Sequence, residues 1–176
     1  PGGHLIWVAI ADVAHFVRSG DSIDNEARYR GNSTYFPDRV VPMLPDSLSG
    51  DLCSLHEGEK RACLVVKMKI DAKGNKLNHK FARALIQSSA SLEYGEVQDA
   101  VDKGTGRQEV LQLLEPVLNP LYGAYNSLKE ARNKRGPLEL NLPERQIEID
   151  KIGKVTEVRF KERLDAHKPV SYTHLT

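Results

Sequence analysis

The sequence has 176 residues, of which 40% are hydrophobic and 28% are charged, and its formal net charge is +1. This composition excludes an intrinsically disordered chain and is typical of one globular domain. No apolar run approaches the roughly 20 residues of a membrane span, so we expect no membrane association. Because the chain begins at Pro1 rather than at methionine, we expect it to be a piece of a longer protein.

The first predicted elements are a strand and a short helix. Residues 4–13 are apolar on both faces, as in a fully covered central strand. Residues 21–31 predict a helix with Asp21 or Ser22 as its N-cap and Gly31 as its end.

The middle of the chain predicts a loop, a hairpin and a second helix. Residues 33–55 contain three prolines and no helical or strand period, which is typical of a long loop that is either disordered or functional. Residues 63–86 alternate between apolar and charged side chains around a glycine-containing turn, which predicts a β-hairpin. Residues 89–102 predict a helix that begins at Ser89 or Ser91.

The last predicted elements are a long helical segment and a second hairpin. Residues 107–136 carry a helical apolar stripe, and we expect Pro116 and Pro120 to break or kink it. Residues 145–160 predict a hairpin. The pattern as a whole indicates an α+β protein.

Charge is unevenly distributed along the chain. Residues 1–59 hold four basic and nine acidic side chains, whereas residues 60–83 hold eight basic side chains against Asp71 alone. The basic segment is either an electrostatic footprint for phosphates or the solvated face of a hairpin. Its basic residues are Lys60, Arg61, Lys67, Lys69, Lys73, Lys76, Lys80 and Arg83.

The side chains alone do not predict an active site. The histidines are scattered, and no serine or cysteine lies in a nucleophile elbow. In the densest acidic group, three members fall where helix caps belong, so we interpret them as caps rather than metal ligands. We expect the fourth, which directly follows the first strand, to order the next turn. The group is Asp12, Asp21, Asp24 and Glu26.

The two cysteines, Cys53 and Cys63, are not part of a CxxC pair or a paired histidine spacing. They make neither a zinc signature nor a disulfide framework. We therefore expect reduced, buried thiols in a cytoplasmic protein.

Several motifs occur in a characteristic order: "IADVAHFV", "GDSIDNEARYRGNS", "VVPMLPDSLSGDLCSL", "LEYGEVQDAV", "KRGPLELNLPE" and "RLDAHK". This order resembles the catalytic domain of the ribonuclease II and ribonuclease R family, the RNB domain, and fits the ribonuclease R branch better. The resemblance covers residues 1–168, whereas residues 169–176 do not match the family and are expected to be a foreign tail.

The resemblance implies a partial RNB domain, with a mixed or antiparallel sheet, hairpins and packed helices around an RNA channel. It also implies that the parent protein is a processive 3′→5′ exoribonuclease. Such an enzyme hydrolyses single-stranded RNA to nucleoside 5′-monophosphates with Mg²⁺, and we expect the parent to be a cytoplasmic monomer.

The resemblance also implies roles for individual residues. Tyr35 falls on an aromatic position that stacks against the 3′-terminal region of the RNA, and Tyr94 falls on a tyrosine close to the scissile phosphate. A third aromatic position of the clamp falls on Leu140, which has no π face, so we expect weaker stacking there. The alternative reading of both tyrosines is ordinary packing.

The chain departs from the family pattern in its catalytic residues. The family's metal-binding run D-x-x-D-x-D-D-A does not occur in residues 1–176, and the family's glutamate position is occupied by Ser171. No catalytic residue or metal ligand of the family is therefore assigned, and we expect the chain itself to be inactive. Two other functions stay open: a non-catalytic RNA-binding module, and a structural or interaction domain.

Overall fold

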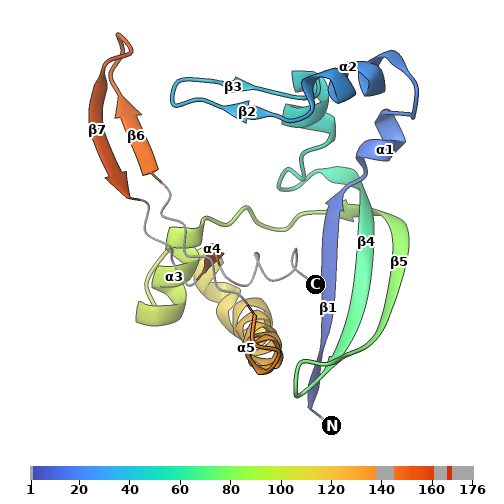
Figure 1. Cartoon of the computed structure of the whole chain (residues 1–176). Coiled ribbons are helices and arrows are strands. Elements are labelled where there is room, and N and C mark those ends of the chain that lie inside the picture. Colours follow the sequence, from blue (N-terminus) through green and yellow to red (C-terminus); the bar gives the residue numbers. More distant parts are fainter. Residues whose placement is uncertain (1, 138–144, 161–165, 168–176) are drawn as a thin grey trace.

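The computed structural model describes residues 2–137, 145–160 and 166–167. Its largest sheet contains β1 (Gly3–Ala11), β4 (Lys60–Asp71) and β5 (Lys76–Gln87) in the order β1-β4-β5, with both pairings antiparallel (Figure 1). The two long strands β4 and β5 form the hairpin predicted from residues 63–86. Helices accompany this antiparallel sheet, which confirms the α+β class.

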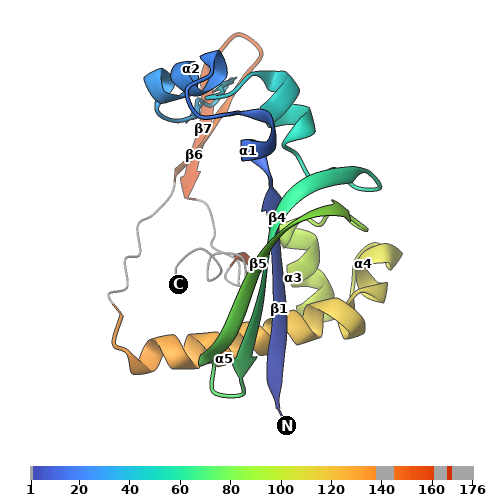
Figure 2. The same ribbon diagram turned by 90° about the vertical axis from the view of Figure 1, so that its right-hand side faces the viewer.

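The main core lies between the sheet and α5 (Asn119–Lys134), which runs across one face of the sheet (Figure 2). Strand register decides which residues meet this helix, because directly paired residues project on the same face. Ile6 pairs with Met68, and Val8 pairs with Val66. Ile6, Ile70 and Ala124 form the buried cluster, with partly buried neighbours packed against it.

The prediction of a fully covered central strand for residues 4–13 is wrong in part. β1 is a strand, but it lies at one edge of the described sheet, and Leu5 and Trp7 are exposed. These two side chains alternate with Ile6 and Val8 and so project on the face opposite α5. An apolar run cannot distinguish a strand with two covered faces from one whose second face is exposed.

Two short helices follow β1. α1 (Val13–Phe16) is one turn long, and α2 (Ser22–Arg30) has Asp21 as its N-cap, whose carboxylate accepts from the Asp24 N–H at 2.7 Å. α2 ends at Gly31, whose φ of 77° favours glycine. The helix, its cap and its end are as predicted.

The aperiodic stretch 33–55 is partly regular, which corrects its prediction as a loop. It contains the short antiparallel strands β2 (Thr34–Tyr35) and β3 (Val40–Val41), followed by the helical segment η1 (Ser47–Leu52). Elements of two to six residues are too short to impose a period on the sequence.

The helices after β5 form a second, smaller core. α3 (Tyr94–Lys103), α4 (Gln108–Gln112) and η2 (Leu114–Leu118) bury Ala100, Val110 and Leu118 against one another. The helical stretch between 107 and 136 is broken as predicted, because α4 ends at Gln112, Pro116 lies in the π-helical segment η2, and α5 begins one residue before Pro120.

The predicted start of α3 at Ser89 or Ser91 is wrong. The helix begins at Tyr94, and the Ser91 N–H is instead bound by the Glu57 carboxylate at 2.7 Å. The last hairpin, β6 (Arg145–Ile149) and β7 (Val155–Phe160), agrees with the prediction for residues 145–160. Among the described helices, none has the length and apolar character that crossing a membrane requires.

Candidate nucleic-acid interface

Tyr35 lies in the β2–β3 hairpin, paired with Val40. The next residue closes the turn, because the Phe36 N–H donates to the Arg39 carbonyl at 2.8 Å. The Arg39 guanidinium also lies 4.8 Å from the centre of the Phe36 ring. The Tyr35 side chain itself is 77% exposed, so its ring is available to a planar ligand.

Contacts at both ends hold this hairpin in place. Before β2, the Ser33 hydroxyl accepts from the Met43 N–H at 2.9 Å. After β3, the Pro42 carbonyl accepts from Arg30 of α2 at 3.0 Å. Further along, Leu48 is buried. The 33–55 stretch is therefore an ordered surface that presents Tyr35, although few of its own side chains are buried.

Tyr94 is the first residue of α3 and is 42% exposed. Its ring stacks on the ring of His167, with centroids 4.1 Å apart and an interplanar angle of 21°. Neighbouring Ala166 is buried, and its N–H donates to the Gln98 side-chain oxygen at 2.8 Å. Ala166 and His167 are thus held against α3 on the side of Tyr94.

A bidentate ion pair secures the other side of α3. Arg107 donates from Nε and Nη2 to the two carboxylate oxygens of Glu96, each at 2.7 Å. These hydrogen bonds, together with the opposite charge of each partner, lower the pKa of Glu96 and raise the pKa of Arg107. The pair joins α3 to the start of α4.

The structure does not bring Tyr35 and Tyr94 together. β2 and α3 lie well apart in both views (Figures 1 and 2). Leu140 and Ser171 lie outside the described residues, as does the whole predicted tail 169–176.

The carboxylates of Asp21, Asp24 and Glu26 cap α2 or form ion pairs with its arginines. The carboxylate of Asp21 accepts the N–H groups of Asp24 and Arg18, which lowers its pKa. Asp24 pairs with Arg28, and Glu26 pairs with Arg30.

The expectation that Asp12 orders the following turn is wrong for its side chain, which makes no capping hydrogen bond. Asp12 is buried and pairs with Arg83 of β5 at 2.9 Å. A buried carboxylate needs a cationic or hydrogen-bonding partner, and the sheet supplies one from a distant strand.

No metal site is built from the described residues. Within the ranges 2–137, 145–160 and 166–167, no three histidine, cysteine or acidic side chains are grouped so that they could hold an ion. These residues therefore do not fit the Mg²⁺ that the family resemblance implies, and we assign no reaction step to a metal here.

The two cysteines are free thiols, as predicted, with Cys63 buried and Cys53 partly buried. Burial, with the nearby Asp12 charge, raises the pKa of both thiols. The thiol form is therefore favoured over the reactive thiolate.

The basic side chains of segment 60–83 fall into two groups, paired arginines and exposed lysines. Arg61 pairs with Asp51 at 2.7 Å and also with Glu59, and Arg83 pairs with Asp12, so both arginines hold the fold together. The six lysines are exposed, and in the described part of the chain none has a carboxylate within ion-pair distance.

Three of these lysines share the sheet face opposite α5. Lys67 pairs with Trp7 on one side and with Lys80 on the other, and Lys69 follows two residues later on the same face. The Lys67 ammonium lies 4.7 Å from the centre of the Trp7 ring. We call Trp7, Lys67, Lys69 and Lys80 the lysine face.

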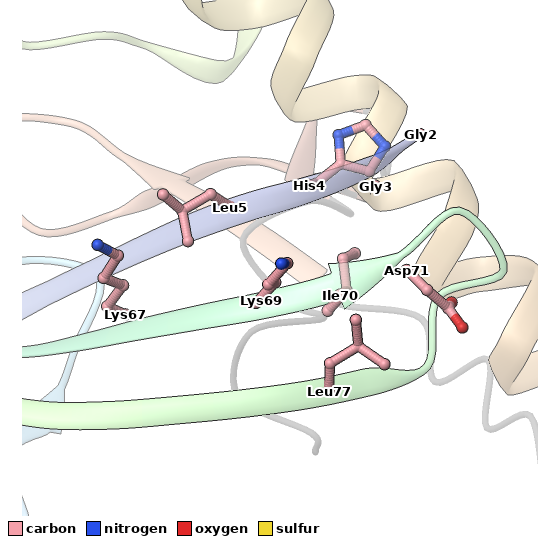
Figure 3. Close-up of a pocket in the computed structure, with 9 residues that line it drawn as sticks. All are labelled: Gly2, Gly3, His4, Leu5, Lys67, Lys69, Ile70, Asp71 and Leu77. Carbon is pink, nitrogen blue, oxygen red and sulfur yellow. The ribbon is translucent and has the colours of Figure 1, made fainter.

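An open hollow lies beside the lysine face, at the end of the sheet near the β4–β5 turn. Figure 3 shows Lys67 and Lys69 along β4, with Leu5 beside them on β1. The hollow is lined by Gly2, Gly3, His4, Leu5, Lys67, Lys69, Ile70, Asp71 and Leu77.

Two features of the candidate interface were missed by sequence reasoning, one on the lysine face and one at α3. Trp7 was assigned to a strand covered on both faces, and only its register opposite Lys67 of β4 places it on the exposed outer face. The contact of His167 with Tyr94 had no sequence signal, because the two residues belong to motifs far apart in the chain.

The sequence matches the RNB domain family over residues 1–175. The chain belongs to the RNB family. Ribonuclease R of Vibrio parahaemolyticus is 40% identical over 167 residues, covering 95% of this chain and 20% of that protein. Ribonuclease R of Escherichia coli is 37% identical over the same length and with the same coverage. The chain therefore spans about a fifth of the length of these curated relatives.

A solved structure confirms the RNB fold. RNase R of Mycoplasma genitalium, in complex with ribose-methylated single-stranded RNA, matches with a TM-score of 0.90 at 30% identity. The match covers 98% of this chain and 27% of that one. The resemblance to the ribonuclease R branch inferred from the motifs is confirmed.

Proposed function

We propose that this chain is the RNA-contacting part of a 3′→5′ exoribonuclease that processively hydrolyses single-stranded RNA to nucleoside 5′-monophosphates. Membership of the RNB family and relatives named ribonuclease R support the reaction class. The observation that carries the RNA role is the ring of Tyr35, which is 77% exposed on a hairpin held at both ends.

Tyr35 and Tyr94 contact the RNA by stacking. Stacking of a base on an aromatic ring is worth about 1–3 kcal/mol and tolerates any base, because every base has a π face. This suits an enzyme that degrades RNA regardless of sequence. Tyr35 binds near the 3′-terminal region, Tyr94 binds near the scissile phosphate, and Leu140 offers only an apolar contact in this proposal.

Other properties belong to the longer protein in this proposal. The longer protein is a cytoplasmic monomer that uses Mg²⁺ held by aspartates outside residues 1–176. In the 176-residue chain, Ser171 stands in the place of the family's glutamate. The 176-residue chain then binds RNA and does not cleave it.

The second candidate function, a non-catalytic RNA-binding module, is favoured by the lysine face. Three lysines without carboxylate partners among the described residues, beside the exposed Trp7, combine cations for phosphates with an aromatic ring. The two candidates differ in whether the longer protein cleaves the RNA.

The test is RNA binding and RNA hydrolysis by the purified 176-residue chain and its Tyr35→Ala variant. Fluorescence anisotropy with a labelled single-stranded oligonucleotide is expected to show about tenfold weaker binding for the variant, the loss of one base stack. Tyr29→Ala is the matched control, because Tyr29 is 88% exposed on the neighbouring α2 and outside the proposed interface.

Three results would contradict parts of the proposal. No binding at low salt would favour a structural or interaction domain. Equal losses for the two tyrosine variants would remove the specific role of Tyr35. Release of nucleoside monophosphates in Mg²⁺, from a preparation free of contaminating nuclease, would show that the chain cleaves RNA by itself.

A further inference from the structure

Tyr94 and His167 form an aromatic pair that connects two distant parts of the chain. Their ring centroids are 4.1 Å apart and the ring planes are inclined by 21°. A nearly parallel pair at this distance has the stacked geometry that aromatic side chains favour. One face of the Tyr94 ring is therefore covered by His167, while the side chain as a whole is 42% exposed.

The position of His167 is fixed by its neighbour Ala166. The Ala166 N–H donates to the Gln98 side-chain oxygen at 2.8 Å, and Ala166 is 5% exposed. Gln98 also donates from its amide nitrogen to Asp102 at 2.6 Å, so its amide is held at both ends. Because Gln98 lies four residues after Tyr94 on α3, the anchor and the stacked ring share one face of the helix.

This arrangement restricts the Tyr94 side chain before any ligand arrives. A tyrosine at the first position of a helix has few neighbours of its own and can adopt more than one rotamer. The His167 ring removes much of that freedom. Since Tyr94 is still 42% exposed, its accessible area lies on the part of the ring that His167 does not cover. A ligand that stacks on the open face then loses less conformational entropy on binding.

We propose that His167 is a positioning residue that stacks beneath Tyr94 and presents the free face of the Tyr94 ring to a nucleobase of single-stranded RNA. This inference rests on the proposed RNA contact of Tyr94. It adds a residue outside the aromatic clamp and makes the Tyr94 contact depend on the chain around Ala166. The Gln98–Ala166 hydrogen bond is the anchor of the pair.

The test is a double-mutant cycle in the 176-residue chain. Affinity for a labelled oligouridylate is measured by fluorescence anisotropy in EDTA for the parent, His167→Ala, Tyr94→Ala and the double variant. We expect His167→Ala to weaken binding about fivefold and Tyr94→Ala to weaken it about tenfold or more. The double variant is expected to bind as Tyr94→Ala does, because His167 acts only through the tyrosine.

A second comparison separates stacking from bulk. His167→Phe keeps a ring beneath Tyr94, whereas His167→Leu fills a similar space without a π face. We expect the phenylalanine variant to bind RNA within twofold of the parent and the leucine variant to resemble His167→Ala. The comparison of His167→Phe with His167→Leu tests the inference if His167→Ala does not fold.

Each outcome bears on a stated point. Unchanged RNA affinity in Tyr94→Ala would overturn the RNA contact of Tyr94 and, with it, the role of His167. Weaker binding in Tyr94→Ala with parent-like binding in His167→Ala would overturn the His167 inference alone. Additive losses in the double variant, or a phenylalanine variant no better than leucine, would show that His167 does not act through stacking on Tyr94.

Discussion

The β4–β5 and β2–β3 hairpins are both antiparallel, but they differ in what their side chains contact. β4–β5 extends over twelve residues in each strand, and its strand β4 packs Ile70 and Met68 into the core against α5. β2–β3 has two residues in each strand, all exposed, including Tyr35. The long hairpin is stabilised by its own packing, whereas the short one is held by contacts at its ends. A side chain offered to a ligand needs a rigid backbone beneath it but not a buried core around it.

The largest expected effect lies in the long hairpin. Ile70→Ala removes a side chain that is 2% exposed in the main core, so the free energy of unfolding should fall by about 3 kcal/mol. Leu77→Ala is the matched control, since Leu77 is 59% exposed on the partner strand and should cost less than about 0.5 kcal/mol. Urea denaturation measures both values. Similar losses for the two variants would show that the β4–α5 contact is not the main core.

The next effect concerns the turn of the same hairpin. Gly74 has φ of 78°, and a Cβ there would lie 2.1 Å from the Ser127 carbonyl oxygen of α5. Gly58 has a similar φ of 75°, but its Cβ would have nothing within 4 Å. Both alanine variants incur the backbone strain, whereas only Gly74→Ala must move the turn away from α5. We expect Gly74→Ala to cost about 2 kcal/mol more than Gly58→Ala by urea denaturation. Equal costs would mean that the turn does not rest on the helix.

The smallest effect concerns the N-cap of α2, the helix whose Arg30 contacts the β2–β3 hairpin. Hydrogen bonds from the N–H groups of Asp24 and Arg18 lower the pKa of Asp21 below its ordinary 3.8. Its contribution to stability is therefore present above pH 3.8 and is lost as the pH falls through the lowered value. Asp21→Asn keeps an N-cap but does not titrate, so its thermal midpoint should fall less steeply in acid. Parallel curves for the parent and the variant would exclude this role for Asp21.

Local signals in the sequence predicted most elements because each depends on neighbouring residues. Alternation from Leu64 to Ile70 predicted the long hairpin, and Asp21 with Gly31 predicted both ends of α2. The start of α3 was misplaced because Ser91, a residue typical of N-caps, bonds to Glu57 through its backbone instead. The short strands around Tyr35 could not be predicted, since two residues carry no period.

The candidate site was predictable only as separate residues. The motifs indicated Tyr35 and Tyr94, and they are exposed, although their contact with RNA remains a prediction. The sequence did not indicate that His167 covers one face of Tyr94 or that Arg83 neutralises Asp12. Each of these contacts joins side chains from elements that are far apart in the chain.

The sequence by itself determined the RNB family and the type of most helices and strands, and it indicated which tyrosines to propose for RNA contact, because motifs and periods are local properties. The tertiary structure decided which faces are covered. Register placed Trp7 with the lysines of β4 on the outer face, α5 buried the other face, and packing against α3 put His167 beneath Tyr94. Burial and stacking depend on contacts between distant segments, and such contacts exist only once the chain has folded.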